Sequence, residues 1–307
     1  CCRTLPWLWL PSRLHPLPSL IVPKMTMSPR RFLVFHNPQV SHSAELARQI
    51  EGYLRKDSGV HAQCVLVSDV DQSPFDGAEI LLAVGGDGTM LRVGRVGAKL
   101  GCPVLGFNLG QVGFLPQVPE VEWRAALELV LSGDFELERR MLVFGEQIRD
   151  GEIITGHHAL NEIVVMRGAL ARPVRLETEV DSAALANYVA DGLIISTPTG
   201  STAYALAAGG PILPPTLRNL VVTPVSPHLS VGRAVVLAEG CTINITVRTD
   251  HQAILSADGQ TEMEVLDGDC IRVRASERDC NFVRLQPPNY FYRDLSQRLV
   301  IKGRSLQ

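Results

Sequence analysis

The sequence predicts an α/β protein with two domains, the first built around a parallel sheet and the second made mostly of β-strands. Strand-like and helix-like segments alternate as far as about residue 135, which is the pattern of a parallel sheet with crossover helices. Beyond that point, short β-branched segments are separated by turn residues, which is typical of an antiparallel sandwich. A chain of 307 residues is also long for a single hydrophobic core.

The first domain is expected over residues 29–138, as a Rossmann-like α/β fold. Leu46 and Ile50 belong to a helical apolar spacing that predicts an amphipathic helix over 44–56. A second helix is expected to begin near Thr89. Short apolar runs predict buried strands at 32–35, 63–67, 80–84 and 103–107.

The second domain is expected over residues 139–283, as a β-rich, sandwich-like unit. Ile243, Ile245 and Val247 alternate with polar neighbours, which predicts a strand with one buried face. Dipeptides such as Asp150-Gly151 predict the turns. The other expected strands cover 141–148, 159–166, 174–180, 193–196, 261–265 and 271–275.

The composition excludes several classes of protein. With 46% hydrophobic and 20% charged residues the chain is not disordered, and a net charge of −3 gives no reason to expect a nucleic-acid partner. No apolar run approaches 20 residues, so we expect no membrane partner. The seven scattered cysteines favour a reducing, cytoplasmic compartment. We assign no metal-binding residues of the zinc kind, because the adjacent His157 and His158 point to opposite faces of a strand and cannot easily bind one ion.

The first 28 residues form a separate segment. They contain several prolines, which interrupt the continuous apolar core of a signal peptide. We interpret them as a disordered leader or as translated upstream sequence, with Met25 or Met27 as the start. A targeting peptide is the alternative.

The strongest local signal is the segment Gly85-Gly86-Asp87-Gly88-Thr89, directly after the apolar run 80–84. Glycines let the backbone approach a phosphate closely, and a helix that opens here adds positive partial charge at its N-terminus. Asp87 at the end of a parallel strand is placed to accept a proton from an attacking hydroxyl, or to help hold magnesium. The alternative is a tight strand-to-helix turn without a ligand.

Three further segments have residue types that suit a nucleotide. Phe114 ends the glycine-rich stretch 106–115 and could flank a planar ring, or simply pack in the core. Asn161 and Glu162 form a polar pair in an apolar run, which suits sugar hydroxyls or a strand end that faces water. In the hydroxyl-rich stretch 191–204, a helix is expected to begin near Ser201 or Thr202. The stretch could bind a base, although helix capping explains its Ser and Thr residues equally well.

Together these segments resemble the NAD kinase family. The matching blocks are GGDGT at 85–89, G-x-N-x-G-x-x-GFL at 106–115, NE at 161–162, DGLIISTPTGSTAY at 191–204, AGGPIL at 208–213, TPVSPH at 223–228 and DGQ at 258–260. The GGDGT block also occurs in lipid kinases, whereas TPTGSTAY together with NE is much more specific. The resemblance implies an α/β nucleotide-binding domain, a β-rich NAD-binding domain and a final segment, 284–307, that returns to the first domain.

The resemblance also implies an activity and a set of site residues. The family transfers the terminal phosphoryl group of ATP, or in some members of polyphosphate, to the 2′-hydroxyl of the adenosine ribose of NAD, with magnesium or another divalent cation. By motif, Asp87 would be the proton acceptor, and a homodimer or tetramer would build the sites partly across subunits. The binding residues implied are Gly86, Asp87, Gly88, Arg92, Phe114, Asn161, Glu162, Arg172, Asp191, Thr202, Ala203, Tyr204, Ala207 and Gln260.

Two positions depart from the family pattern, and two other functions stay open. Many members have Ser where this chain has Ala207, and Arg where it has Val189, so affinity or donor preference is expected to differ. A lipid kinase would share GGDGT but need an apolar acceptor pocket. A nucleotide sensor would keep the pocket without turnover, although Asp87 is present.

Overall fold

The computed structural model describes residues 29–295, except 71–74, 76, 111, 112, 116, 171, 229–231, 288 and 294. The expected leader over 1–28 and the end of the chain from residue 296 therefore lie outside the described residues, as do two positions of the 106–115 stretch. None of the helices in these described ranges is long and apolar enough to cross a membrane.

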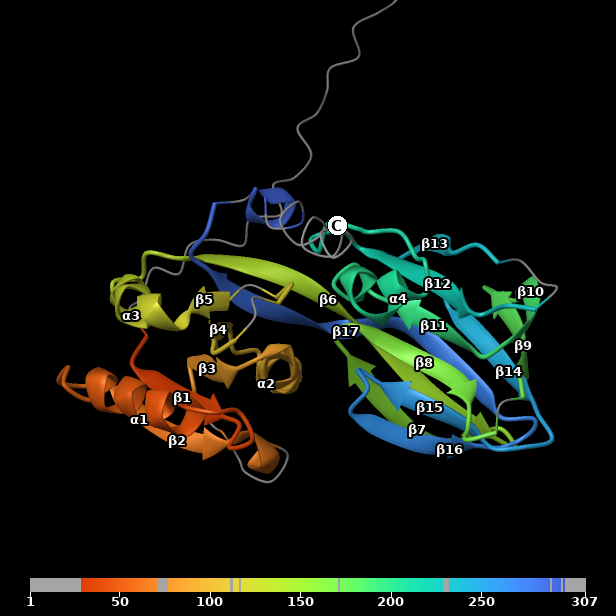
Figure 1. The fold of residues 1–307 in the computed structure, drawn as a ribbon, viewed down its shortest axis with the longest axis horizontal. Helices are drawn as coiled ribbons and strands as arrows, with labels where there is room; N and C mark the ends of the chain where they lie inside the picture. The colour runs from red at the N-terminus through yellow and green to blue at the C-terminus, as the bar shows by residue number, and fades with distance from the viewer. Residues whose placement is uncertain are drawn as a thin grey trace, which may run out of the picture.

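The first part of the chain forms a parallel sheet with helices on both faces (Figure 1). Alternate residues of β3 pack on opposite faces, Leu82 with helices α1 and α3, and Leu81 with α2, which explains the continuous apolar run of this strand. The elements are β1 (Arg31–His36), α1 (Ser43–Leu54), β2 (His61–Leu66), η1 (Val67–Asp69), β3 (Ile80–Gly85), α2 (Asp87–Leu100), β4 (Val104–Asn108), β5 (Gln117–Pro119), η2 (Glu120–Glu122) and α3 (Trp123–Leu131).

Two long antiparallel strands, β6 (Glu136–Arg149) and β17 (Cys270–Arg284), join this sheet to the second part of the chain. Near its end β17 also pairs in parallel with β4, where Phe282 lies opposite Val104. One sheet of 11 strands therefore runs through both parts, with the order β10-β9-β14-β17-β4-β3-β1-β2 along its main path. The domain boundaries expected after residues 138 and 283 fall inside these two strands.

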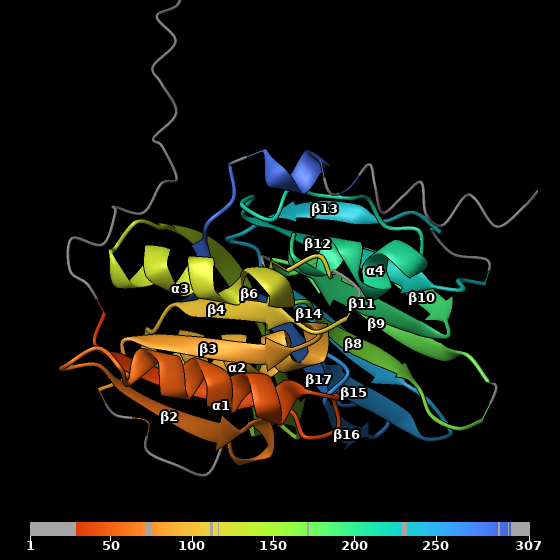
Figure 2. The ribbon, with the colours of Figure 1, turned by 60° about the vertical axis from the view of Figure 1, so that its left-hand side comes forward.

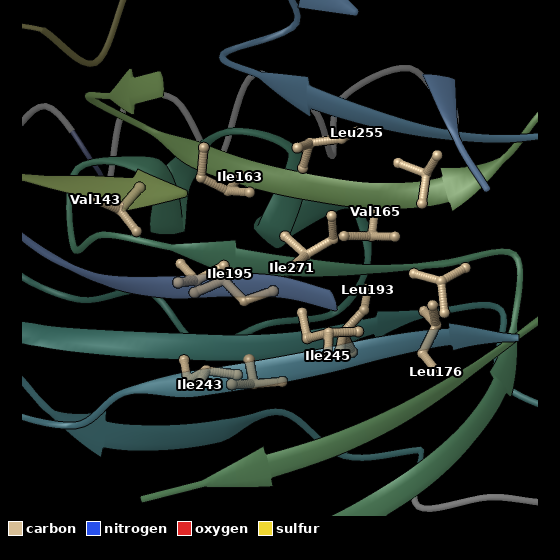
Figure 3. Close-up of a cluster of buried hydrophobic side chains, with 14 of the residues drawn as sticks. Val143, Ile163, Val165, Leu176, Leu193, Ile195, Ile243, Ile245, Leu255 and Ile271 are labelled. Atoms are coloured by element: carbon tan, nitrogen blue, oxygen red, sulfur yellow. The ribbon is translucent and has the colours of Figure 1, made fainter. Parts of the chain in front are cut away.

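The second part is a sandwich of this sheet with a six-stranded sheet of order β13-β12-β11-β8-β15-β16 (Figure 2). Alternate residues from both sheets, such as Leu193 and Ile245, fill the space between them (Figure 3). The remaining strands are β7 (Glu152–Ala159), β8 (Glu162–Arg167), β9 (Val174–Val180), β10 (Ala183–Ala190), β11 (Gly192–Ser196), β12 (Asn219–Val225), β13 (Val235–Ala238), β14 (Ile243–Arg248), β15 (Ala253–Ala257) and β16 (Thr261–Val265). The α/β fold class with a sandwich-like second part is confirmed.

Two local expectations differ from the structure. The single strand expected over 159–166 is divided between β7 and β8, because the backbone N–H groups of 160–162 turn toward the Asp258 carboxylate. The helix expected near Ser201 is a 3-10 turn, η3 (Gly200–Thr202), followed by a short helix, α4 (Tyr204–Ala207). Both irregular segments lie at the same end of the six-stranded sheet, because Glu162 is paired with Ser196.

Candidate active site

The glycine-rich turn places Asp87 as the first residue of α2, directly after β3. Gly85 ends the strand, and a β-carbon there would overlap the hydroxyl of the buried Thr89, so the turn requires glycine at this position. The carbonyl of Gly86 accepts the first backbone hydrogen bonds of the helix, from Thr89 and Met90. Asp87 and Gly88 are exposed at this positive helix end.

The loop after β4 lies against the same carboxylate. A β-carbon on Gly113 would overlap the carboxylate of Asp87, and Phe114 is the next, half-buried residue. Asn108, at the end of β4, is paired with Gly85 and accepts a 2.9 Å hydrogen bond from the Gly110 N–H with its Oδ1. Its buried Nδ2 has no partner among the described residues, which leaves the NH₂ group of this amide unused beside the turn.

Asp258 organises the turn that carries Asn161 and Glu162. Its carboxylate accepts hydrogen bonds from the backbone N–H groups of Leu160, Asn161 and Glu162, at 2.9, 2.8 and 3.2 Å. Burial raises the pKa of Asp258, while these N–H groups and the nearby Arg95 favour its charged form. Asp258 was not among the expected site residues, although the DGQ block at 258–260 contains it.

Arg95 and Gln260 connect this turn to the start of α2. The Nη2 of Arg95 donates to Oε1 of Gln260 at 2.7 Å, and its Nη1 lies 3.6 Å from Oδ2 of Asp258. The Nε2 of Gln260 in turn donates to the carbonyl of Gly88 at 3.2 Å. The sandwich and the glycine-rich turn are therefore joined by direct side-chain contacts, and Arg95 is a second residue that the sequence did not single out.

Glu162 is a buried carboxyl group with unused hydrogen-bonding capacity. Burial, and then the charge of Asp258, raise the pKa of Glu162 to about 8, so it is mostly protonated at neutral pH. Its Oε2 has no partner within the described part of the chain, nor does the hydroxyl of Ser196 on the neighbouring strand. A protonated carboxyl group both donates and accepts hydrogen bonds, as a sugar hydroxyl does.

The hydroxyl-rich loop after β11 packs against the Asn161 turn. Gly200 approaches the backbone of Asn161 so closely that a β-carbon would overlap its carbonyl oxygen. The hydroxyl of Thr197 donates to the carbonyl of Leu160 at 2.6 Å, and that of Thr202 donates to the carbonyl of Thr199 at 3.1 Å. These hydroxyls therefore shape the loop.

The expected site residues fall into two groups. Gly86, Asp87, Gly88 and Phe114 lie around the α2 turn, while Asn161, Glu162 and Gln260 face it from the sandwich, and Thr202, Ala203, exposed Tyr204 and exposed Ala207 follow on the adjoining loop and α4. Arg92 is exposed on α2, one turn further along. Apart from Phe114, which lies on the loop after β4, these residues lie at the same end of β8 and β11 as Glu162 or on the α2 segment linked to it.

Arg172 and Asp191 lie at the other end of the six-stranded sheet. Asp191 forms a 2.8 Å ion pair with Arg167, the last residue of β8, and Arg172 lies 3.7 Å from Asp250. This end is separated from Glu162 by the length of β8, and five residues of strand span about 16 Å. The structure of one chain therefore does not bring these two residues to Asp87.

The fold and the site define a class of protein, namely a nucleotide-handling enzyme built from an α/β domain and a β-sandwich. Family models match on both parts: the ATP-NAD kinase N-terminal domain on residues 37–135 and the ATP-NAD kinase C-terminal domain on residues 160–285. An NAD kinase of Geotalea daltonii is 39% identical over 267 residues, which is 85% of this chain and 94% of the relative. An NAD kinase of Geobacter sulfurreducens is 41% identical over 215 residues, covering 70% and 76% of the two chains.

Solved structures agree with these sequence relatives. An NAD kinase from Archaeoglobus fulgidus in complex with ATP superposes with a TM-score of 0.65 at 28% identity, over 87% of this chain and 97% of that chain. The yeast NADH kinase complexed with NADH has the same fold, with a TM-score of 0.79 at 22% identity over 94% of each chain. The chain belongs to the NAD kinase family, and it is a kinase.

Proposed function

We propose that the chain transfers the terminal phosphoryl group of ATP, or of polyphosphate, to the 2′-hydroxyl of the adenosine ribose of NAD, giving NADP. The observation that carries the proposal is the contact of the Asp87 turn with the sandwich, through Gly88, Gln260 and Arg95. This contact sets a possible base beside polar groups that suit a ribose. The names of the relatives, NAD kinases of two bacteria, support the same acceptor.

The reaction needs one proton acceptor. The 2′-hydroxyl oxygen attacks the terminal phosphorus, and an oxygen–phosphorus bond forms as the bond to the bridging oxygen of the donor breaks. With ATP as the donor, ADP leaves with the electron pair of that bond, and the hydroxyl proton passes to the Asp87 carboxylate. The exposed N–H end of α2 stabilises the negative charge on the transferred group.

The acceptor nucleotide would be held from the sandwich side. Asn161 and the protonated Glu162 offer an amide and a neutral carboxyl group to ribose hydroxyls or to the nicotinamide amide. The exposed ring of Tyr204, with Thr202 and Ala203, would surround a base, and Phe114 would flank a ring from the α/β side. Gln260 would close the site against Gly88.

Magnesium would reach the site on the phosphates of the donor. When bound, it neutralises charge on the phosphate oxygens. The Asp87 carboxylate, exposed at the turn, is an oxygen ligand of the kind that magnesium prefers, so the residues present fit such an ion. Arg92, exposed on α2, would contact the same phosphates.

Arg172 and Asp191 would complete the site of a second copy in a cytoplasmic homo-oligomer. Their position at the far end of β8 supports this proposal, since one chain cannot bring them to its own Asp87 turn. An Asp191→Asn variant is expected to raise the KM for NAD while the oligomeric mass, measured by light scattering, stays that of the wild type. A monomeric wild-type protein with full activity would contradict the shared site.

The activity is tested by incubating the full chain with NAD, magnesium and ATP and detecting NADP with an NADP-specific dehydrogenase. Asp87→Asn is expected to lower the rate by about 10²–10⁴-fold, since it removes the base. Asp57→Asn, an exposed carboxylate after α1, serves as the matched control and should keep the wild-type rate. If folded wild-type protein makes no NADP with ATP or with polyphosphate, the proposal is wrong.

A further inference from the structure

A cavity of about 500 Å³ lies between α2 and the sandwich, outside the glycine-rich turn. One wall is the side of α2 that carries Arg92, Arg95 and Lys99. The other wall comes from β7, from the β15–β16 hairpin and from Arg278 in the irregular middle of β17. We call this space the basic cavity.

The charged side chains that line the basic cavity are all positive. The cations Arg92, Arg95, Lys99 and Arg278 line it, and no Asp or Glu is found among the described lining residues. Arg95 is engaged with Asp258 and Gln260, but Arg92, Lys99 and Arg278 form no ion pair with a described carboxylate. Like charges that converge without a counter-charge repel one another, which an anion bound between them relieves.

Burial, together with the same positive charges, lowers the pKa values of the two histidines of the cavity. Burial and the neighbouring arginines lower the pKa of His158 to about 4, and burial with Arg95 lowers the pKa of His157. Both rings therefore stay neutral at physiological pH. His158 lies 3.0 Å from the hydroxyl of Ser276 and His157 lies 2.8 Å from that of Thr155, so each has a hydroxyl partner.

The spacing of the cations along α2 favours an extended anion. Arg92 and Lys99 are seven residues apart on one helix, which corresponds to roughly 10 Å along its axis. The row begins a little more than one turn after Asp87, and Arg95 is linked through Gln260 to Gly88. A chain of phosphates that ended at Asp87 would have cations beside it along α2.

We propose that the basic cavity binds the phosphate chain of the donor, beyond the phosphoryl group that is transferred. The proposal rests on the proposed kinase function. It names condensed phosphate as the ligand class: the diphosphate part of ATP, or the following residues of polyphosphate. The cations at the far end, Lys99 and Arg278, then determine how well a long donor binds.

The first test measures binding without catalysis. Inorganic tripolyphosphate is titrated into the full chain by calorimetry, at constant ionic strength. Lys99→Ala and Arg278→Ala are each expected to weaken binding by about tenfold, the cost of a lost charge-assisted hydrogen bond. Both residues are exposed, so the variants should fold, and thermal unfolding verifies this. Arg48→Ala is the matched control, because Arg48 is an exposed residue of α1, which covers the opposite face of the sheet.

The second test measures kinetics with ATP and with polyphosphate as donors. The same two variants are expected to raise the KM for the donor while the KM for NAD stays unchanged, and tripolyphosphate should compete with the donor. If wild-type protein makes NADP but the variants keep the wild-type donor KM, the donor assignment is overturned, even if tripolyphosphate binds as an effector. If wild-type protein makes no NADP, the proposed function has failed instead, and the calorimetry reports on the cavity alone.

Discussion

Gly113 lies directly against the carboxylate of Asp87, so closely that a β-carbon at position 113 would overlap the carboxylate oxygens. Asp87 opens helix α2 after β3, and Gly113 lies on the loop after β4, the parallel strand next to β3. The glycine therefore serves the site by leaving room for a particular side chain. Glycine is not required here by a left-handed backbone conformation, because Gly113 is not among the glycines of positive φ.

Replacement of Gly113 by alanine is expected to displace the Asp87 carboxylate and to lower kcat by about tenfold or more, since small misplacements of a reacting group are costly. The rate of NADP formation measures this effect. Gly110→Ala is the matched control, because a β-carbon on Gly110 meets nothing within 4 Å. Equal rates for the two variants would show that the contact does not position Asp87.

Replacement of Asp258 by alanine is expected to destabilise the fold by about 3 kcal/mol, because three buried N–H groups lose their acceptor at once. Urea unfolding followed by circular dichroism measures the change. Asp267→Ala, in the exposed turn before β17, provides a comparison in which a single N–H group, that of Thr249, loses its acceptor. If Asp258→Ala lowers the unfolding free energy no more than this control does, the 160–162 turn does not depend on the Asp258 carboxylate.

The raised pKa of Glu162 makes the stability depend on pH in a defined direction. The folded protein keeps the proton up to a pKa of about 8, whereas the unfolded chain releases it near 4.5, so the folded state binds more protons between these values. Stability from this group is therefore present below pH 4.5 and is lost as the pH rises toward 8, by roughly 1 kcal/mol per pH unit.

Glu162→Gln should remove this contribution. The difference in unfolding free energy between wild type and variant, measured in urea from pH 5 to pH 8.5, is expected to shift in favour of the glutamine variant as the pH rises. A difference that stays constant over this range would mean that Glu162 titrates near its ordinary pKa. The comparison of two proteins cancels the other titrating groups.

A buried ion network joins the hydroxyl-rich loop to the segment after β17. Arg140, only 1% exposed, donates to Glu138 at 2.8 Å, to the hydroxyl of Tyr290 at 2.7 Å and more weakly to Thr199 at 3.4 Å. Arg140→Ala is expected to cost about 3–5 kcal/mol of unfolding free energy, because the buried Glu138 loses its nearest cation and keeps, among the described residues, only the Tyr290 hydroxyl and the 3.7 Å contact with Arg284. Tyr290→Phe, which removes one hydroxyl, should cost about 1–2 kcal/mol. Denaturant unfolding measures both, and a larger cost for the tyrosine variant would contradict this account.

Several features of this protein follow from the sequence alone because they depend on neighbouring residues. The apolar run of β3 and the glycines after it predict a strand, a turn and a helix, and Asp87 opens that helix within two residues of the expected start. The alternation of Ile243 and Ile245 likewise predicts one buried face of a sandwich strand. Local spacing and steric freedom determine both features.

Other features depend on contacts between distant parts of the chain. Asp258 caps a turn 96 to 98 residues earlier in the sequence, and Gln260 contacts Gly88 across 172 residues. β6 and β17 carry one sheet through both expected domains, and only their pairing reveals this continuity. Hydrophobic periodicity records which face of an element is buried, and it carries no information on which distant polar group completes a hydrogen bond there. The sequence therefore names candidate residues by motif, whereas the packing of the sandwich against α2 decides which of them lie near Asp87.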